Sequence, residues 1–265
     1  NIDETDPSVG KGVLKVAKIA EDRFDVVSNQ FSMHYFFKDI KTVHNFIRNV
    51  CECCKISGYY IGTTYDGTKI FKKLKKKKYE ESISIIKNER KMWEIKKMYD
   101  KDDFPSDENS LGYAIDIYQE SINKYFTEFL VNFDYFTHLM KIYGFDLLTK
   151  DQLNDIGLKN SIGTFKELFN MMNEEIENGD LKKNDVGTAS KMSTKEKNVS
   201  FLNNYFIFQK KRNVDAKNIY NMHVNTDIHK KLEEEKDNEE KEPSPAIIPI
   251  KRKVKKLKTK YKMPK

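Results

Sequence analysis

Cysteine is scarce in this chain, and long hydrophobic runs are missing from it. The three cysteines, Cys51, Cys53 and Cys54, stand together, whereas a disulfide framework spreads its cysteines, and a zinc site needs further Cys or His at ligand spacing. We therefore expect reduced thiols on a helix of a cytosolic or nuclear protein, and no metal. No apolar stretch reaches the roughly 18 residues of a membrane span, and no hydrophobic signal segment opens the chain.

Charge is abundant and unevenly distributed. Charged residues make up 34% of the chain, which is too much for all 265 residues to fold, while 12% aromatic residues argue against general disorder. The net charge of +7 is compatible with nucleic acid or an anionic membrane and does not decide between them. Basic clusters at Lys72–Lys78 and Lys251–Lys262 contrast with the acidic segment Glu233–Glu242.

Hydrophobic patterning in the first part of the chain predicts a strand, a helix and a second strand. Phe24–Ser28 is typical of a buried strand, and a helix capped by Asp39 follows and ends near Ser57 and Gly58. Tyr59–Thr64 then predicts the second strand. Short joints between these elements predict a parallel βαβ unit with a right-handed crossover, and hence an α/β fold.

The rest of the chain is expected to alternate in the same way, with two charged inserts at about 68–110 and 150–190. The first insert contains a lysine-rich helix, and two Ser/Thr-x-x-Glu capping boxes interrupt the polar, irregular residues 150–200. From residue 212 to 265 hydrophobic periodicity fades, which predicts a disordered charged tail. The remaining predicted elements are strands at Gly112–Tyr118, Phe145–Leu148 and Asn204–Gln209, a helix capped by Asn132, and the capping boxes Thr164/Glu167 and Ser193/Glu196.

Asn29–Phe37, the loop after the first strand, concentrates polar and aromatic side chains. Ligands of doubly wound α/β sheets bind at the carboxyl ends of parallel strands. This loop would place an amide, an imidazole, a phenol and several rings there. From the residues alone, an aromatic loop after a strand more often belongs to the core than to a ligand site, so both interpretations stay open.

The sequences of four blocks, taken in chain order, resemble one protein family. Phe24–Phe37 reads FDVVSNQFSMHYFF and resembles the FDxxSxQFxxHYxF signature of mRNA cap (guanine-N7) methyltransferases. Gly58–Thr64 resembles the family's next strand, Thr127–Val131 resembles its PEFLV element, and Phe206–Lys210 resembles its closing strand. A lone aromatic loop is weak evidence, but four blocks in order at compatible spacing are specific.

The resemblance implies a class I, Rossmann-like fold dependent on S-adenosylmethionine, with its N-terminal half absent from this chain. Residues 1–211 would be the C-terminal portion of the catalytic domain. The implied activity is methyl transfer from S-adenosylmethionine to N7 of the guanine cap of mRNA. The implied partners are the capped 5′ end and other capping or transcription proteins, in the nucleus.

The resemblance also implies roles for five residues. Gln30, Phe31 and Tyr35 match positions that bind the cofactor, while His34 and Glu128 match positions that contact the cap. No catalytic base is expected, because guanine N7 already has a free lone pair and catalysis then rests on proximity and electrostatics.

The chain departs from the family pattern in several places. No D-x-G-x-G-x-G cofactor loop occurs in it, and Tyr65 stands where the family often has proline. A cap-contacting tyrosine of the family's last strand falls on Asn203, with Tyr205 two residues away, so neither is assigned. The missing loop keeps a second function open, a non-catalytic RNA-binding or scaffold module.

The basic clusters are ambiguous as well. Lys72–Lys78 is compatible with RNA phosphates or with a solvated helix face. Lys251–Lys258 is compatible with a nuclear localisation signal or an RNA-contacting tail.

Overall fold

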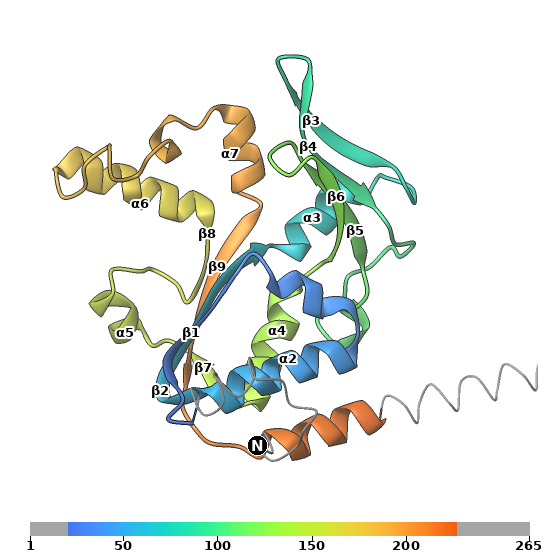
Figure 1. Ribbon diagram of the computed structural model, residues 1–265, viewed down its shortest axis with the longest axis vertical. Helices are drawn as coiled ribbons and strands as arrows, with labels where there is room; N and C mark the ends of the chain where they lie inside the picture. The colour runs from blue at the N-terminus through green and yellow to red at the C-terminus, as the bar shows by residue number, and fades with distance from the viewer. Residues whose placement is uncertain (1–20, 227–265) are drawn as a thin grey trace, which may run out of the picture. The chain divides into compact units, whose positions relative to one another are not determined.

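The computed structural model describes residues 21–226, which form an α/β fold with two sheets (Figure 1). The first sheet has the order β1-β2-β9-β7, with β8 paired to β9. β1 and β2 are parallel, whereas β9 runs antiparallel to β2, β7 and β8. The predicted α/β class is confirmed. The strands of this sheet are β1 (Phe24–Gln30), β2 (Cys54–Tyr65), β7 (Phe145–Leu147), β8 (Ile162–Thr164) and β9 (Asn203–Lys210).

Helix α2 (Ile40–Cys53) forms the predicted crossover between β1 and β2. The Asp39 side chain accepts a hydrogen bond from the Thr42 backbone N–H at 2.7 Å, which confirms the predicted cap. The predicted helix end near Ser57 and Gly58 is wrong, because β2 already begins at Cys54. Phe24 pairs with Cys54 but Val26 pairs with Tyr59, so Ser57 (φ 64°) belongs to a bulge in β2.

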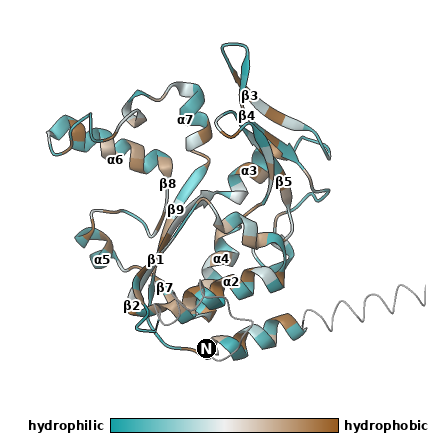
Figure 2. Cartoon of the chain, in the orientation of Figure 1, coloured by the Kyte–Doolittle hydropathy of each residue, from teal (hydrophilic) through white to brown (hydrophobic). Residues whose placement is uncertain are grey.

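The core of the first sheet is largely aromatic. Tyr60, Phe206 and Phe208 from the sheet pack against Phe136 of α4 (Phe133–Ile142). Asn132 caps α4 as predicted, since its side chain accepts from two backbone N–H groups of the first turn. Hydrophobic and hydrophilic residues alternate along α2 and α4 (Figure 2), as expected for helices that bury one face.

The first predicted insert contains half of a second sheet. After α3 (Gly67–Leu74), residues 82–97 form a hairpin rather than an irregular segment, so this prediction is corrected. Side chains along these strands point alternately to a buried face and to a polar face. The many charged residues obscure this alternation in the sequence. The antiparallel order is β3-β4-β5-β6, namely β3 (Ser82–Lys87), β4 (Arg90–Lys97), β5 (Ala114–Gln119) and β6 (Lys124–Phe129).

The second predicted insert is more regular than expected. Both capping boxes are confirmed: Thr164 with Glu167 opens α6, and Ser193 with Glu196 opens α7. These helices extend beside the sheets as a separate arm (Figure 1). The short elements not yet named are η1 (Met33–Lys38), η2 (Glu108–Ser110), α5 (Lys150–Asp155), α6 (Phe165–Asn178), η3 (Ala189–Lys191) and α7 (Thr194–Ser200).

The predicted disordered tail is wrong over its first part. Residues 216–226 are helical, and Ala216 and Val224 are buried while His223 stacks on His44 with ring centroids 4.7 Å apart. The acidic segment Glu233–Glu242 and the basic run Lys251–Lys262 lie outside the described residues, as do residues 1–20. Within residues 21–226, no helix is long and apolar enough to cross a membrane.

Candidate active site

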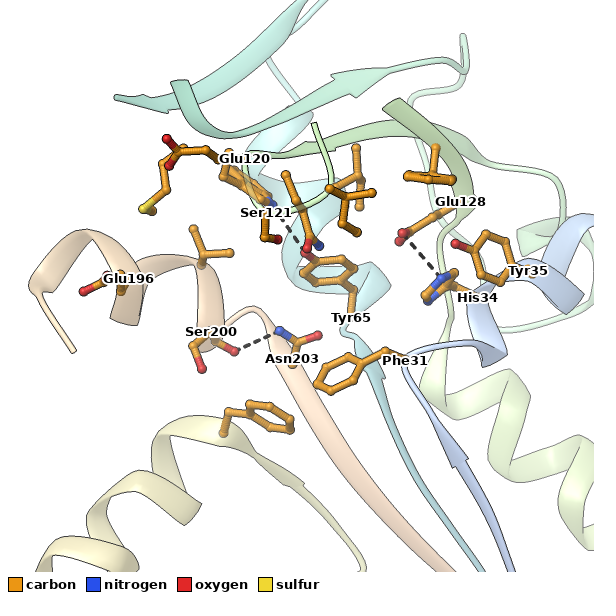
Figure 3. Close-up of a pocket in the computed structure, with 18 residues that line it drawn as sticks. Phe31, His34, Tyr35, Tyr65, Glu120, Ser121, Glu128, Glu196, Ser200 and Asn203 are labelled. Atoms are coloured by element: carbon orange, nitrogen blue, oxygen red, sulfur yellow. Dashed lines mark hydrogen bonds and ion pairs between the residues drawn. The ribbon is translucent and has the colours of Figure 1, made fainter. Parts of the chain in front are cut away.

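A cavity of about 640 Å³ lies where the two sheets and the α6–α7 arm meet (Figure 3). The loop after β1 and the end of β2 form one side, the inner face of the second sheet forms another, and α6, α7 and the start of β9 form the third. The carboxyl ends of the parallel strands β1 and β2 therefore open into it, which is where α/β sheets bind ligands.

His34 and Glu128 face each other on the wall of this cavity. His34 comes from η1 and Glu128 from β6, and they are only 3% and 6% exposed. The His34 Nε2 atom lies 3.5 Å from Glu128 Oε1. Burial lowers the pKa of His34 to about 4 and raises the pKa of Glu128 to about 8. At neutral pH most molecules therefore carry both groups uncharged, so the contact is not a structural ion pair.

Both side chains keep unused hydrogen-bonding atoms. Counting every described residue, His34 Nε2 and Glu128 Oε2 are buried without a hydrogen-bond partner. Only His34 Nδ1 is engaged, 3.3 Å from the hydroxyl of Thr64 on β2. Native proteins satisfy most buried polar atoms, because an orphaned one costs free energy. Two such atoms lie beside an open cavity and are available to a bound ligand.

Tyr35 and Phe31 complete the side formed by the loop. The Tyr35 ring packs edge-on against His34 at 4.3 Å, and burial, followed by the charge of Glu128, raises the pKa of its hydroxyl. Phe31 adopts a left-handed backbone (φ 52°) that its N–H stabilises by donating to Thr63 O at 2.9 Å. Its half-exposed ring meets Phe165 of α6 edge-on at 5.9 Å.

The comparisons with known proteins now bear on this site. A model of the mRNA (guanine-N(7))-methyltransferase domain matches residues 6–211, which is most of the chain. The chain belongs to this family. Its match to a probable mRNA-capping enzyme of Acanthamoeba polyphaga mimivirus is 30% identical and covers 56% of the chain but 12% of the relative. A 50-residue match to the mRNA cap guanine-N(7) methyltransferase of Caenorhabditis briggsae is 40% identical and covers 19% of the chain and 13% of that relative.

The chain thus spans only a small part of the length of these relatives. Among solved structures, an S-adenosylmethionine-dependent methyltransferase from Clostridium acetobutylicum aligns with 11% identity and a TM-score of 0.36, over 71% of this chain and 58% of that one. A score of that size does not by itself establish a shared fold. The family membership rests on the domain match.

The structure brings together four of the five residues that the resemblance to cap methyltransferases singled out. Phe31, His34, Tyr35 and Glu128 all line the cavity. Gln30 does not line it. Its exposed side chain donates to the Ser28 hydroxyl at 3.0 Å and accepts from the Thr63 hydroxyl at 2.8 Å, at the end of β1 beside the cavity.

The structure also distinguishes Asn203 from Tyr205. Asn203 lines the cavity, donates to Ser200 O at 3.0 Å, and has an Oδ1 without a hydrogen-bond partner within the described part of the chain. The Tyr205 hydroxyl instead donates to Asn160 O at 3.0 Å, and its ring packs against Gly163 outside the cavity. At the position that aligns with the family's tyrosine, this chain thus has the amide side chain of Asn203.

Sequence reasoning missed the back wall of the cavity. Tyr65, which stands where the family often has proline and was therefore given no role, lines this wall. Its hydroxyl accepts a hydrogen bond from the Trp93 indole at 3.3 Å, and burial raises the pKa of that hydroxyl to about 12. Ile117 and Phe126 of the second sheet continue the apolar surface. The only available signal was the alternation of apolar residues in the insert, which the charges around it obscured.

Two exposed polar contacts connect α7 to the second sheet. Lys87 at the end of β3 pairs with Glu196 at 3.0 Å, and the Lys195 ammonium donates to the backbone carbonyl of Ile86 at 2.6 Å. These contacts place α7, with Glu196 and Ser200, opposite the sheet across the cavity (Figure 3).

Proposed function

We propose that this chain is part of an enzyme that transfers a methyl group from S-adenosylmethionine to N7 of the guanine cap of mRNA. The observation that carries the proposal is the orphaned carboxyl group of Glu128 on the cavity wall. Guanine presents adjacent N1–H and N2–H₂ donors, and one carboxylate accepts from both, whereas adenine offers no such pair. The family membership supports the same substrate class.

His34 and Tyr35 would orient the base rather than exchange protons with it. Burial keeps His34 uncharged at neutral pH, so its free ring nitrogen offers one hydrogen bond without repelling the product, which carries positive charge on its purine. Tyr35 stacks edge-on against His34 and fixes its ring. Neither residue needs to act as a base, because N7 attacks through a lone pair that is already free.

The cavity also fits the cofactor chemically. S-adenosylmethionine, when bound, supplies an electrophilic methyl group on a sulfonium sulfur. Phe31 and Phe165 expose aromatic surface at the cavity rim, which suits a flat adenine ring and a nearby cation. Gln30 and Tyr35 would contact the adenosyl part. A nuclear location follows from this function in cells that make mRNA in a nucleus.

Methyl transfer to capped RNA tests the proposal. In the full-length protein, Glu128→Ala should lower kcat/KM at least about 100-fold, because two hydrogen bonds to a charged acceptor are lost. A matched control is Glu120→Ala, since Glu120 lines the same cavity but is exposed. Incorporation of radiolabelled methyl groups gives the rates. Unchanged activity of Glu128→Ala, with normal folding, would contradict the role of Glu128.

Binding of S-adenosylhomocysteine tests the cofactor side separately. Titration calorimetry of the full-length protein should show weaker binding for Gln30→Ala and Phe31→Ala. Asn29→Ala serves as a control, because the Asn29 side chain lies in the same segment, accepts from the Ser32 hydroxyl at 2.8 Å, and matches no cofactor-binding position. Equal affinity of all variants would exclude Gln30 and Phe31 from the cofactor site.

A further inference from the structure

The outer face of the second sheet carries a pair of tyrosines that the proposed chemistry does not use. Side chains alternate along each strand, so Gln119 faces the cavity whereas its neighbour Tyr118 points to the opposite face. Tyr118 of β5 is in register with Tyr125 of β6, with ring centroids 5.3 Å apart. Tyr125 is 45% exposed and Tyr118 is half-buried, so both rings present a surface to solvent.

Buried Glu94 holds this pair in place. Its carboxylate accepts hydrogen bonds from the Tyr125 hydroxyl, the Lys91 ammonium and the Ser82 hydroxyl. The Lys91 ammonium also donates to the Tyr125 hydroxyl at 2.8 Å. Because three donors converge on Glu94, the ring and the ammonium are fixed before any ligand arrives, and less conformational entropy is lost on binding.

Cations surround the two rings. The Lys91 ammonium lies 5.1 Å from the Tyr118 centroid and 5.4 Å from the Tyr125 centroid, and the Lys96 ammonium lies 5.7 Å from the Tyr125 centroid. Two acids share this face: Glu94 pairs with Lys91, and Asp116, in register with Lys96, accepts from the Thr127 hydroxyl at 2.7 Å. The surface therefore presents the two rings and the two ammonium groups beside one half-buried acid.

Exposed rings beside lysines match the chemistry of single-stranded nucleic acid. Unpaired bases stack on aromatic rings, and phosphates pair with the surrounding cations. A double helix offers no free base faces to Tyr118 and Tyr125. The charge and the rings together favour a single-stranded polyanion over a protein partner, whose interface cores are depleted in lysine.

We infer that this face, formed by Lys91, Lys96, Tyr118 and Tyr125, binds the single-stranded RNA that follows the cap. The identity of that RNA as a capped transcript rests on the proposed function. Both tyrosines flank the β5–β6 turn, and the turn residues Glu120, Ser121 and Ile122 line the cavity. The turn therefore connects the cavity to the two rings, and an RNA chain that leaves the cavity over this turn would reach them.

Binding of a fluorescein-labelled, uncapped single-stranded RNA of about ten nucleotides to the whole 265-residue chain tests the inference. By fluorescence anisotropy, Tyr125→Leu should weaken binding about tenfold, because one stacked base is lost. Tyr125→Phe keeps the ring and should bind within about twofold of wild type. Phe24→Leu removes a similarly exposed ring from the other sheet and should leave the affinity unchanged.

Lysine variants test the phosphate contacts. Lys96→Gln should reduce the slope of log affinity against log salt by about one, whereas Lys41→Gln, on exposed α2 surface, should not change it. Wild-type affinity of Tyr125→Leu, as expected if the face docks a protein, would overturn the inference. So would an equal loss in Tyr125→Phe, because the ring would then not be the binding element.

A cap analogue separates this inference from the proposed function. Binding of GpppG should be lost in Glu128→Ala and retained in Tyr125→Leu. Unchanged GpppG affinity in Glu128→Ala would defeat the proposed cap site, yet a selective loss of RNA affinity in Tyr125→Leu would still support the RNA-binding face.

Discussion

Two glutamates on opposite faces of the second sheet are exposed to a similarly small extent but have different surroundings. Glu94 is 9% exposed on the outer face, and Glu128 is 6% exposed on the cavity face. Burial tends to raise the pKa of Glu94, but hydrogen bonds from Lys91, Ser82 and Tyr125 outweigh this effect and hold it at about 2. For Glu128 burial acts without such donors and raises the pKa to about 8.

The difference teaches that donors as well as depth decide the charge of a buried acid, because Glu128 is more deeply enclosed by protein than Glu94 and also lacks hydrogen-bond donors. A carboxylate with three donors is stable in its charged form and organises its neighbours. A carboxyl group without donors costs free energy when charged, and this cost is recovered only when a ligand brings the donors. Glu94 therefore fixes its neighbours on the outer face, whereas Glu128 keeps one oxygen beside the cavity without a hydrogen-bond partner among the described residues.

The largest expected effect is the pH dependence of stability caused by Glu128. Because its pKa is raised in the folded state, the folded chain retains a proton that the unfolded chain loses, so stability falls as pH rises from about 4.5 to about 8. Glu128→Gln cannot titrate and should be more stable than wild type by about 5 kcal/mol near pH 9, with little difference below about pH 5. Urea unfolding across this range measures the gap, and a pH-independent gap would refute the buried, orphaned state of Glu128.

A smaller effect of opposite sign is expected on the other face. Glu94→Gln leaves the ammonium of Lys91 without its counter-charge and weakens the acceptor for Tyr125, which should lower the free energy of unfolding by about 2 kcal/mol at neutral pH. Methyl transfer should persist under conditions where the variant is folded. If Glu94→Gln were as stable as wild type, the contrast between the two faces would disappear.

The smallest effect concerns the cap analogue. The guanine donors need a charged Glu128, so GpppG binding should release a proton and strengthen about tenfold per pH unit between about pH 6 and pH 7.5. Calorimetry in two buffers of different ionisation enthalpy detects that proton. Glu128→Gln should show weak binding with no pH dependence, and a flat wild-type profile would argue against a carboxylate contact.

Much of the first sheet was predictable because its signals are local. The Asp39 and Asn132 caps and the short apolar strands each depend on a few adjacent residues, and all are present in the structure. The prediction that the first strand is buried is wrong, because β1 lies at the edge of the described sheet and is mostly exposed. The second sheet was not predictable, since its hairpin mixes buried and charged positions. The helix at 216–226 was missed because its Val224 and His223 gain their contacts from distant parts of the chain.

The residues of the site also divide into those that the sequence predicted and those that it did not. The loop at Phe31–Tyr35 and Glu128 were singled out through their resemblance to a family, and the fold places them on one cavity. Trp93 and Phe165 were not, because nothing in their local sequence ties them to a ligand. Asn203 and Tyr205 lie on the same face of the last strand, so the choice between them depended on how far the cavity extends along that strand. Pairing with β8 places Tyr205 against Gly163, whereas Asn203 lies beside Tyr65 at the cavity.

The contacts of Lys87 with Glu196 and of Lys195 with the Ile86 carbonyl join α7 to the second sheet, alongside the packing of Val199 against the core of that sheet. Exposed pairs of this kind contribute only about 0–1 kcal/mol and are screened by salt. Salt therefore weakens the polar part of this junction and leaves the packing of Val199 in place. Under the proposed function, the residence time of the methylated product becomes sensitive to ionic strength through these two contacts.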